Sequence, residues 1–159
     1  MKRVAGFTLL ELLVVLAIIA LGSAGVGFAM RDSAQTRLER EALRLGALLE
    51  SARARAQVGG VAVRWRMTAT GFRFDALTAA QPVPDLPRNW LDVDTRARIE
   101  RAAGGIGQAA KGDPEALLLG PDPIIEPQAV TLYSASQPEQ RVRLATDGVR
   151  PFAVQAGTP

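Results

Sequence analysis

The amino-acid sequence predicts an α+β protein in which one long N-terminal helix packs on a small head of antiparallel β-strands. Three observations support this fold class. The stretch Leu12–Met30 is apolar and carries no charged residue. Residues 31–58 are charged but keep the three- and four-residue spacing of an amphipathic helix. Beyond Gly60, apolar and polar residues begin to alternate, as they do in strands.

The chain begins with a short basic segment, residues 1–6, which contains Lys2 and Arg3 and ends in Gly6. The apolar part of the predicted helix follows as residues 7–30. Its uncharged stretch is about 30 Å long at about 1.5 Å per residue, which matches the thickness of a bilayer core. We therefore expect a single membrane span, with the two basic residues on the cytoplasmic side.

Two ordinary export signals compete with this interpretation. A secretory signal peptide has an apolar stretch of about 7–15 residues and is cut after it. The apolar stretch here is longer than that. A plain signal anchor fits the length, but it does not explain Glu11, an acid at the edge of the apolar layer. A buried carboxylate is costly there, so a partner or a function is expected. The alternative is a helix cap, because Thr8 and Glu11 have capping-box spacing.

The junction Gly6-Phe7-Thr8-Leu9-Leu10-Glu11, followed by an unbroken apolar helix, resembles the signature of type IV prepilins and type II secretion pseudopilins. The resemblance implies that a prepilin peptidase cuts between Gly6 and Phe7 and methylates the new N-terminus on Phe7. It also implies that Glu11 meets the amino terminus of a neighbouring subunit during filament assembly. Opposite charges in a medium drier than water attract strongly, which makes this role reasonable.

The second half of the helix, residues 31–58, is expected to pack on the head. One face carries its apolar residues, and Gly59-Gly60 is a stop signal. The predicted buried positions are Leu38, Ala42, Leu45, Leu49, Ala52 and Ala56.

The head is expected to comprise residues 59–159. A hairpin is predicted from Val61–Met67 and Phe72–Phe74, and later strands at Ala129–Tyr133, Arg141–Ala145 and Pro151–Val154. Between them, residues 81–88 hold three prolines and cannot form a central strand. Residues 90–127 are interpreted as a loop-rich insertion with a short helix at Thr95–Ala103 and flexible glycines at 104, 105 and 107.

The segments Glu41–Ala56 and Val142–Phe152 resemble minor pseudopilin H of type II secretion systems. This resemblance implies a subunit at or near the tip of a periplasmic filament that drives protein export across the outer membrane. The implied partners are prepilin peptidase, other major and minor pseudopilins, an inner-membrane assembly platform and exported substrates. The implied location is the inner membrane, crossed once, with the head in the periplasm.

Composition argues against an enzyme. The chain has no histidine and no cysteine, which excludes the usual nucleophile pairs, disulfides, and zinc sites built from those residues. We expect no catalytic residue, no cofactor and no metal; Asp92 and Asp94 alone are too few to hold calcium. Trp65, between Arg64 and Arg66, could stack a nucleobase, but an inward-facing strand position explains it more simply.

Charge does not indicate a polyanion-binding surface. Outside Lys2, Arg3 and Glu11, the 17 basic and 15 acidic groups nearly balance. Two other functions stay open. A DNA-binding minor pilin of a competence or twitching system would show a basic stripe on the folded head and salt-sensitive affinity. A membrane-anchored enzyme would need a convergent cluster of carboxylates or serines.

Overall fold

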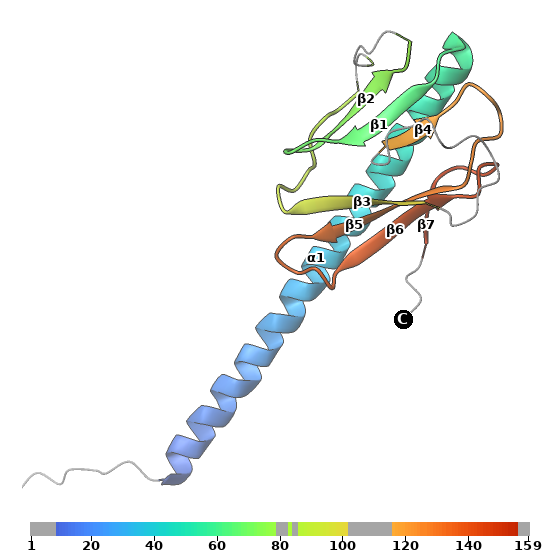
Figure 1. The fold of residues 1–159 in the computed structure, drawn as a ribbon. Helices are drawn as coiled ribbons and strands as arrows, with labels where there is room; N and C mark the ends of the chain where they lie inside the picture. Colours follow the sequence, from blue (N-terminus) through green and yellow to red (C-terminus); the bar gives the residue numbers. More distant parts are fainter. Residues whose placement is uncertain (1–8, 79–82, 84–85, 102–115, 156–159) are drawn as a thin grey trace, which may run out of the picture.

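One long helix carries the head along its C-terminal half and extends beyond it at the N-terminal end (Figure 1). A computed structural model describes residues 9–78, 83, 86–101 and 116–155, without the side chains of residues 22–33 and 101. Helix α1 spans Leu9–Gly59 without interruption. Gly60 follows with a φ of 63°, a left-handed conformation that glycine adopts without steric cost. The predicted helix and its glycine stop are therefore confirmed from residue 9 onward.

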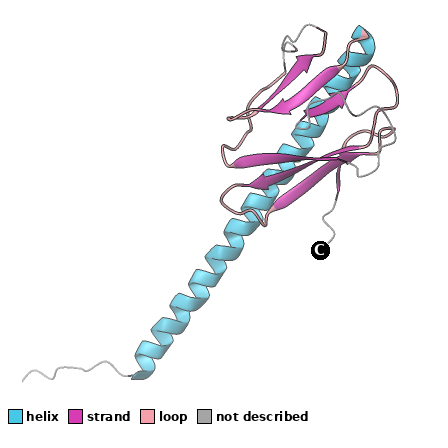
Figure 2. Ribbon diagram, viewed as in Figure 1, coloured by secondary structure: helices cyan, strands magenta, loops and turns pink. Residues whose placement is uncertain are grey.

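Within the described residues, seven strands form two antiparallel sheets, which lie on the same side of α1 (Figure 2). The first sheet has the strand order β2-β1-β4, with β1 at Val63–Met67, β2 at Phe72–Ala76 and β4 at Ala116–Leu119. The second has the order β3-β5-β6-β7, with β3 at Thr95–Arg101, β5 at Gln128–Ser134, β6 at Arg141–Thr146 and β7 at Ala153–Gln155. The predicted α+β class and antiparallel pairing are confirmed.

The prediction of a short helix at Thr95–Ala103 was wrong, because Thr95–Arg101 forms a strand, β3, and the remaining two residues lie outside the described ones. Its residues alternate, with Thr95 buried and Arg96 and Arg98 exposed. It pairs with β5 over seven positions, and this pairing outweighs the weak local preference of so short a segment for helix. The sequence analysis also missed β4. The predicted glycine loop at 104–107 lies outside the described residues.

A single core lies between α1 and the inner faces of both sheets. All six helix positions predicted to be buried are at most 3% exposed. From β1 and β2, Trp65 and Phe72 are fully buried, with their ring centroids 6.1 Å apart. Trp65 therefore faces the core, as predicted, and offers no ring face to a nucleobase. Burying side chains of this size stabilises the fold by about 2–3 kcal/mol each.

Two buried polar side chains of α1 fix the loops of the head. Glu41 is 1% exposed and accepts a hydrogen bond from the Leu91 amide at 2.8 Å. Arg53 is 6% exposed and donates to the carbonyl oxygens of Pro123 at 2.6 Å and Gly148 at 3.1 Å. Since a buried charged group is costly without partners, these contacts hold the loops at fixed positions along the helix.

Candidate functional site

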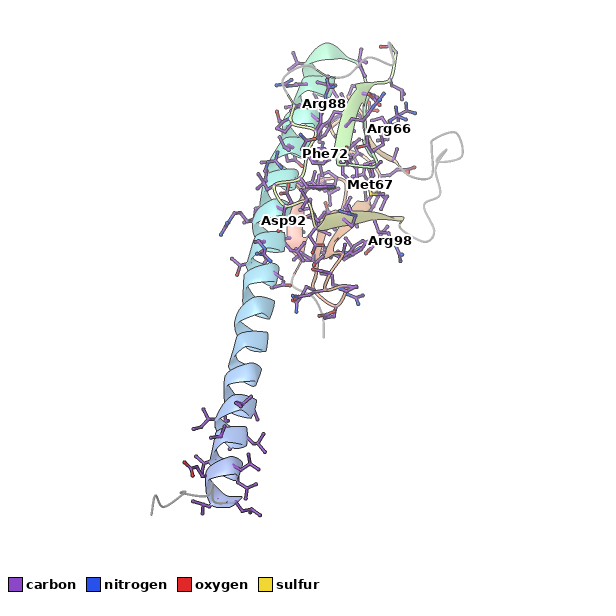
Figure 3. All side chains as sticks on the ribbon, turned by 90° about the vertical axis from the view of Figure 1, so that its left-hand side faces the viewer. Arg66, Met67, Phe72, Arg88, Asp92 and Arg98 are labelled. Carbon is purple, nitrogen blue, oxygen red and sulfur yellow. The ribbon has the colours of Figure 1, made fainter. Side chains whose placement is uncertain are left out.

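The N-terminal end of α1 is apolar on every side and makes no contact with the head (Figures 1 and 3). Ten large apolar side chains there are between 44% and 77% exposed: Leu9, Leu10, Leu12, Leu13, Val14, Val15, Leu16, Ile18, Ile19 and Leu21. Consecutive residues on a helix point in directions about 100° apart, so these side chains cover its whole circumference. A helix of this kind is stable only when lipid or other protein covers it.

Glu11 lies in the first turn of this apolar end and is exposed. An acid in the first turn interacts favourably with the helix dipole. No other ionisable side chain occurs between Leu9 and Leu21. The structure thus presents one carboxylate on an apolar surface. Gly6 and Phe7, the predicted cleavage and methylation residues, lie outside the described residues, as does the Thr8 of the capping box.

The membrane span expected over residues 7–30 is not confirmed. Among the residues that the structure describes, no helix is both long enough and apolar enough to cross a membrane.

The outer face of the first sheet holds a compact charge cluster around Asp75. Arg66 and Arg73 face each other across β1 and β2, and each Nε donates to the Asp75 carboxylate, at 2.9 and 2.8 Å. Asp75 is 1% exposed, although it points away from the core. Arg64 is its direct partner across the strands, but the buried Nε of Arg64 makes no hydrogen bond within the described chain. The cluster therefore carries more positive than negative charge.

The outer face of the second sheet is also rich in arginine. Its four outward arginines are Arg96 and Arg98 on β3 and Arg141 and Arg143 on β6. We call this set the arginine grid. Glu100 accepts hydrogen bonds from Thr131 on β5 and from Arg143, at 2.7 Å for the latter. The Thr131 bond, followed by the Arg143 bond, lowers the pKa of Glu100, which therefore stays ionised.

Asp92 and Asp94 are already engaged within the protein. Asp92 forms an ion pair with Arg37 at 3.3 Å. Both oxygens of Asp94 accept hydrogen bonds, from the hydroxyls of Ser134 and Ser136 and from the Ser136 amide. These bonds lower the pKa of Asp94, the Ser134 bond most. Within the described residues, no group of three or more acidic side chains could hold a metal ion. Asp92 therefore joins the loop before β3 to α1, and Asp94 joins the same loop to the β5–β6 turn.

The N-terminal region carries a recognised family signature. Residues 1–27 match the family described as the prokaryotic N-terminal methylation motif. This match shows a prepilin-type motif at the N-terminus of the chain.

The fold is similar to that of a solved minor pseudopilin, EpsH from the Type 2 Secretion System of Vibrio cholerae. The TM-score is 0.55 at 15% sequence identity, and the match covers 76% of this chain and 97% of the other. No curated protein matches the chain by sequence. The resemblance to prepilins and minor pseudopilins is therefore confirmed for the N-terminal motif and for the fold.

Sequence reasoning found the apolar helix and Glu11 but missed the arginine grid. In the sequence, Arg96 and Arg98 alternate with apolar residues, and so do Arg141 and Arg143. This alternation could have indicated two strands that each carry arginines on one face. The pairing of both strands with β5, which places the two pairs on one face, is a tertiary feature.

Proposed function

We propose that this chain is a minor pseudopilin, a structural subunit at or near the tip of a type II secretion pseudopilus that drives protein export across the outer membrane. The observation that carries the proposal is the apolar end of α1, exposed on all sides, within a segment that matches the N-terminal methylation motif. The assignment to a minor subunit rests on the fold shared with EpsH. The chain acts by assembly and not as an enzyme.

In this proposal the precursor enters the inner membrane with residues 7–30, and the head stands in the periplasm. Prepilin peptidase cuts between Gly6 and Phe7 on the cytoplasmic side and methylates Phe7. The apolar end of α1 stays on the mature protein, first among lipids and then among the helices of other major and minor pseudopilins. Both environments cover the side chains that the isolated chain leaves exposed.

Glu11 selects the register of assembly. Cleavage creates a positive amino group on Phe7, and an unpaired charge among apolar helices is costly. A neighbouring subunit that brings its amino group close to Glu11 places opposite charges together in a medium where they attract strongly. An inner-membrane assembly platform then extends the filament toward exported substrates.

The test is intact-mass analysis of the full chain expressed with and without prepilin peptidase, for wild type and for Gly6→Ala. We expect peptidase-dependent loss of Met1 to Gly6, gain of one methyl group on Phe7, and impaired cleavage in the variant. An uncut chain, or a cut beyond the apolar stretch, would show that the protein is an ordinary anchored or secreted one.

A further inference from the structure

The arginine grid lies on the face of the head that is turned away from α1. Figure 3 shows Arg98 and Arg66 on the side of the head away from α1, so the outer faces of both sheets are turned the same way. Strand register places Arg96 and Arg141 on either side of Tyr133, and Arg98 and Arg143 on either side of Thr131. The four arginines therefore occupy the corners of a rectangle.

The dimensions of the rectangle follow from strand geometry. Residues two apart on a strand are separated by about 7 Å, and strands two apart by about 10 Å. Guanidinium groups at the corners are thus close enough to act on the same group of carboxylates. At these separations two like charges in water repel by about 0.5 kcal/mol per pair. Attraction to the carboxylates of an acidic partner that covers the face would offset this repulsion.

The grid is only partly neutralised within the chain. Among the described outward-facing side chains of β3, β5, β6 and β7, Glu100 is the one carboxylate, and it is bonded to Arg143. Arg96 donates to the carbonyl oxygens of Val93 and Thr95, and its charge also interacts with the Asp94 carboxylate at the start of β3. Arg98 and Arg141 make no hydrogen bond or ion pair within the described residues. Charge complementarity therefore favours an acidic partner.

A hollow on the same face indicates a protein partner. It measures about 180 Å³, and its lining includes Ala129, Ala145, Arg143, Glu100 and Asp147. Small-molecule sites are usually larger, about 300–1,000 Å³, so this hollow fits one side chain of a partner. Two of its lining residues are carboxylates, which would repel the closely spaced phosphates of a duplex lying on the sheet. A polypeptide can carry acids opposite the arginines and another side chain opposite the hollow.

We propose that the arginine grid is a docking surface for an acidic segment of a partner protein, which places carboxylates on Arg98 and Arg141 and one side chain in the hollow beside Arg143. This contact goes beyond the proposed function, because it depends on the folded head and not on cleavage or filament assembly. Interfaces of this kind are enriched in arginine.

The experiment uses the full chain in a nonionic detergent and measures fluorescence anisotropy of a labelled oligoglutamate peptide. Oligoglutamine of equal length and duplex DNA of equal charge are the comparison probes. We expect oligoglutamate to bind, and its affinity to fall at least about tenfold between about 50 and about 300 mM salt. Oligoglutamine should not bind, and the duplex should bind less tightly than oligoglutamate.

The matched variants remove two positive charges each. Arg98→Gln/Arg141→Gln, on the grid, should weaken oligoglutamate binding about tenfold. Arg40→Gln/Arg88→Gln removes exposed arginines elsewhere and should leave binding within about twofold. All four side chains are exposed, so both variants should keep the thermal midpoint of the wild type.

Three outcomes would overturn the proposal. No binding of oligoglutamate at low salt would show that the face attracts no acidic peptide. Equal weakening in both variants would mean that net charge, and not the grid, is responsible. Tighter binding of the duplex would make the face a nucleic-acid surface, as expected of a DNA-binding minor pilin. None of these results depends on peptidase cleavage, so the outcome is independent of the proposed assembly.

Discussion

An Asp75→Asn substitution would remove the charge that holds together the outer face of the first sheet, with almost no change in shape. Arg66 and Arg73 stand directly opposite each other in the β1–β2 register, where like charges are destabilising. Asp75 lies between them, 1% exposed, and accepts a hydrogen bond from each. The asparagine amide is neutral and keeps one acceptor oxygen, whereas its NH₂ group cannot accept a bond from either arginine.

The expected loss of stability follows from these contacts. A hydrogen bond to a charged group contributes about 1.5–3 kcal/mol. The side chains of Arg66 and Arg73 are 33% and 36% exposed, so water replaces part of each bond. We therefore expect the free energy of unfolding to fall by about 2–3 kcal/mol in total. For a head of this size the thermal midpoint falls by about 10–20 °C.

The assay is thermal unfolding of the full chain in nonionic detergent, followed by tryptophan fluorescence, because Trp65 belongs to β1 of the same sheet and is buried. Asp122→Asn, the same change on an exposed loop, should alter stability by less than about 0.5 kcal/mol. Asp75→Asn/Arg73→Gln should recover part of the loss, since it removes one of the two opposed charges. Equal midpoints for Asp75→Asn and Asp122→Asn would refute this account of the cluster.

Three further predictions concern other parts of the chain. Glu11→Gln should be cleaved and methylated like the wild type, but the amount recovered in sheared filaments should be at least about tenfold lower. A tenfold decrease corresponds to a loss of about 1.4 kcal/mol of assembly free energy. Normal recovery of the variant would exclude the charge-pair role of Glu11. The ionised Asp94 carboxylate, whose pKa lies below its ordinary 3.8, stabilises the head above that value, and its contribution is lost as pH falls through the lower folded pKa. Asp94→Asn should therefore be less stable than wild type at neutral pH in urea unfolding, and the difference should shrink as the pH falls below 3.8. A difference that stays constant with pH would contradict this. Gly148→Ala should lower the free energy of unfolding by more than about 2 kcal/mol in the same assay, because the φ of Gly148 is +91° and a new Cβ would lie 1.9 Å from the Ile125 carbonyl oxygen. The control is Gly59→Ala, whose new Cβ meets nothing within 4 Å, and this variant should be nearly neutral or stabilising.

The N-terminal features were predictable because they depend on local patterns. A long apolar stretch, a basic start and one acid can be identified without knowing any tertiary contact. The same holds for the buried face of the second half of α1, where the spacing of Leu38, Leu45 and Leu49 already gives the helical period. The β1–β2 hairpin was predictable because its strands alternate on either side of a short turn.

The insertion between β2 and β5 was only partly predictable. The alternation in β3 was present in the sequence, but seven residues without turn signals match helix and strand patterns almost equally well. Pairing with β5, about thirty residues further along the chain, decided the outcome. Strand β4 has only four residues, and it is stabilised by β1 and by the Gln128 amide, which bonds both backbone groups of Leu118.

The sequence by itself determined the long helix, the position of Glu11 and the overall α+β class. Only the tertiary structure decided the charge distribution of the head. Acidic and basic residues nearly balance in the sequence. Antiparallel pairing nevertheless places Arg96, Arg98, Arg141 and Arg143 on one face of the second sheet. Among the described outward side chains of that sheet, Glu100 is the one carboxylate. Periodicity is a local property, whereas the neighbours of a charge across a sheet depend on which distant strands pair and in which register.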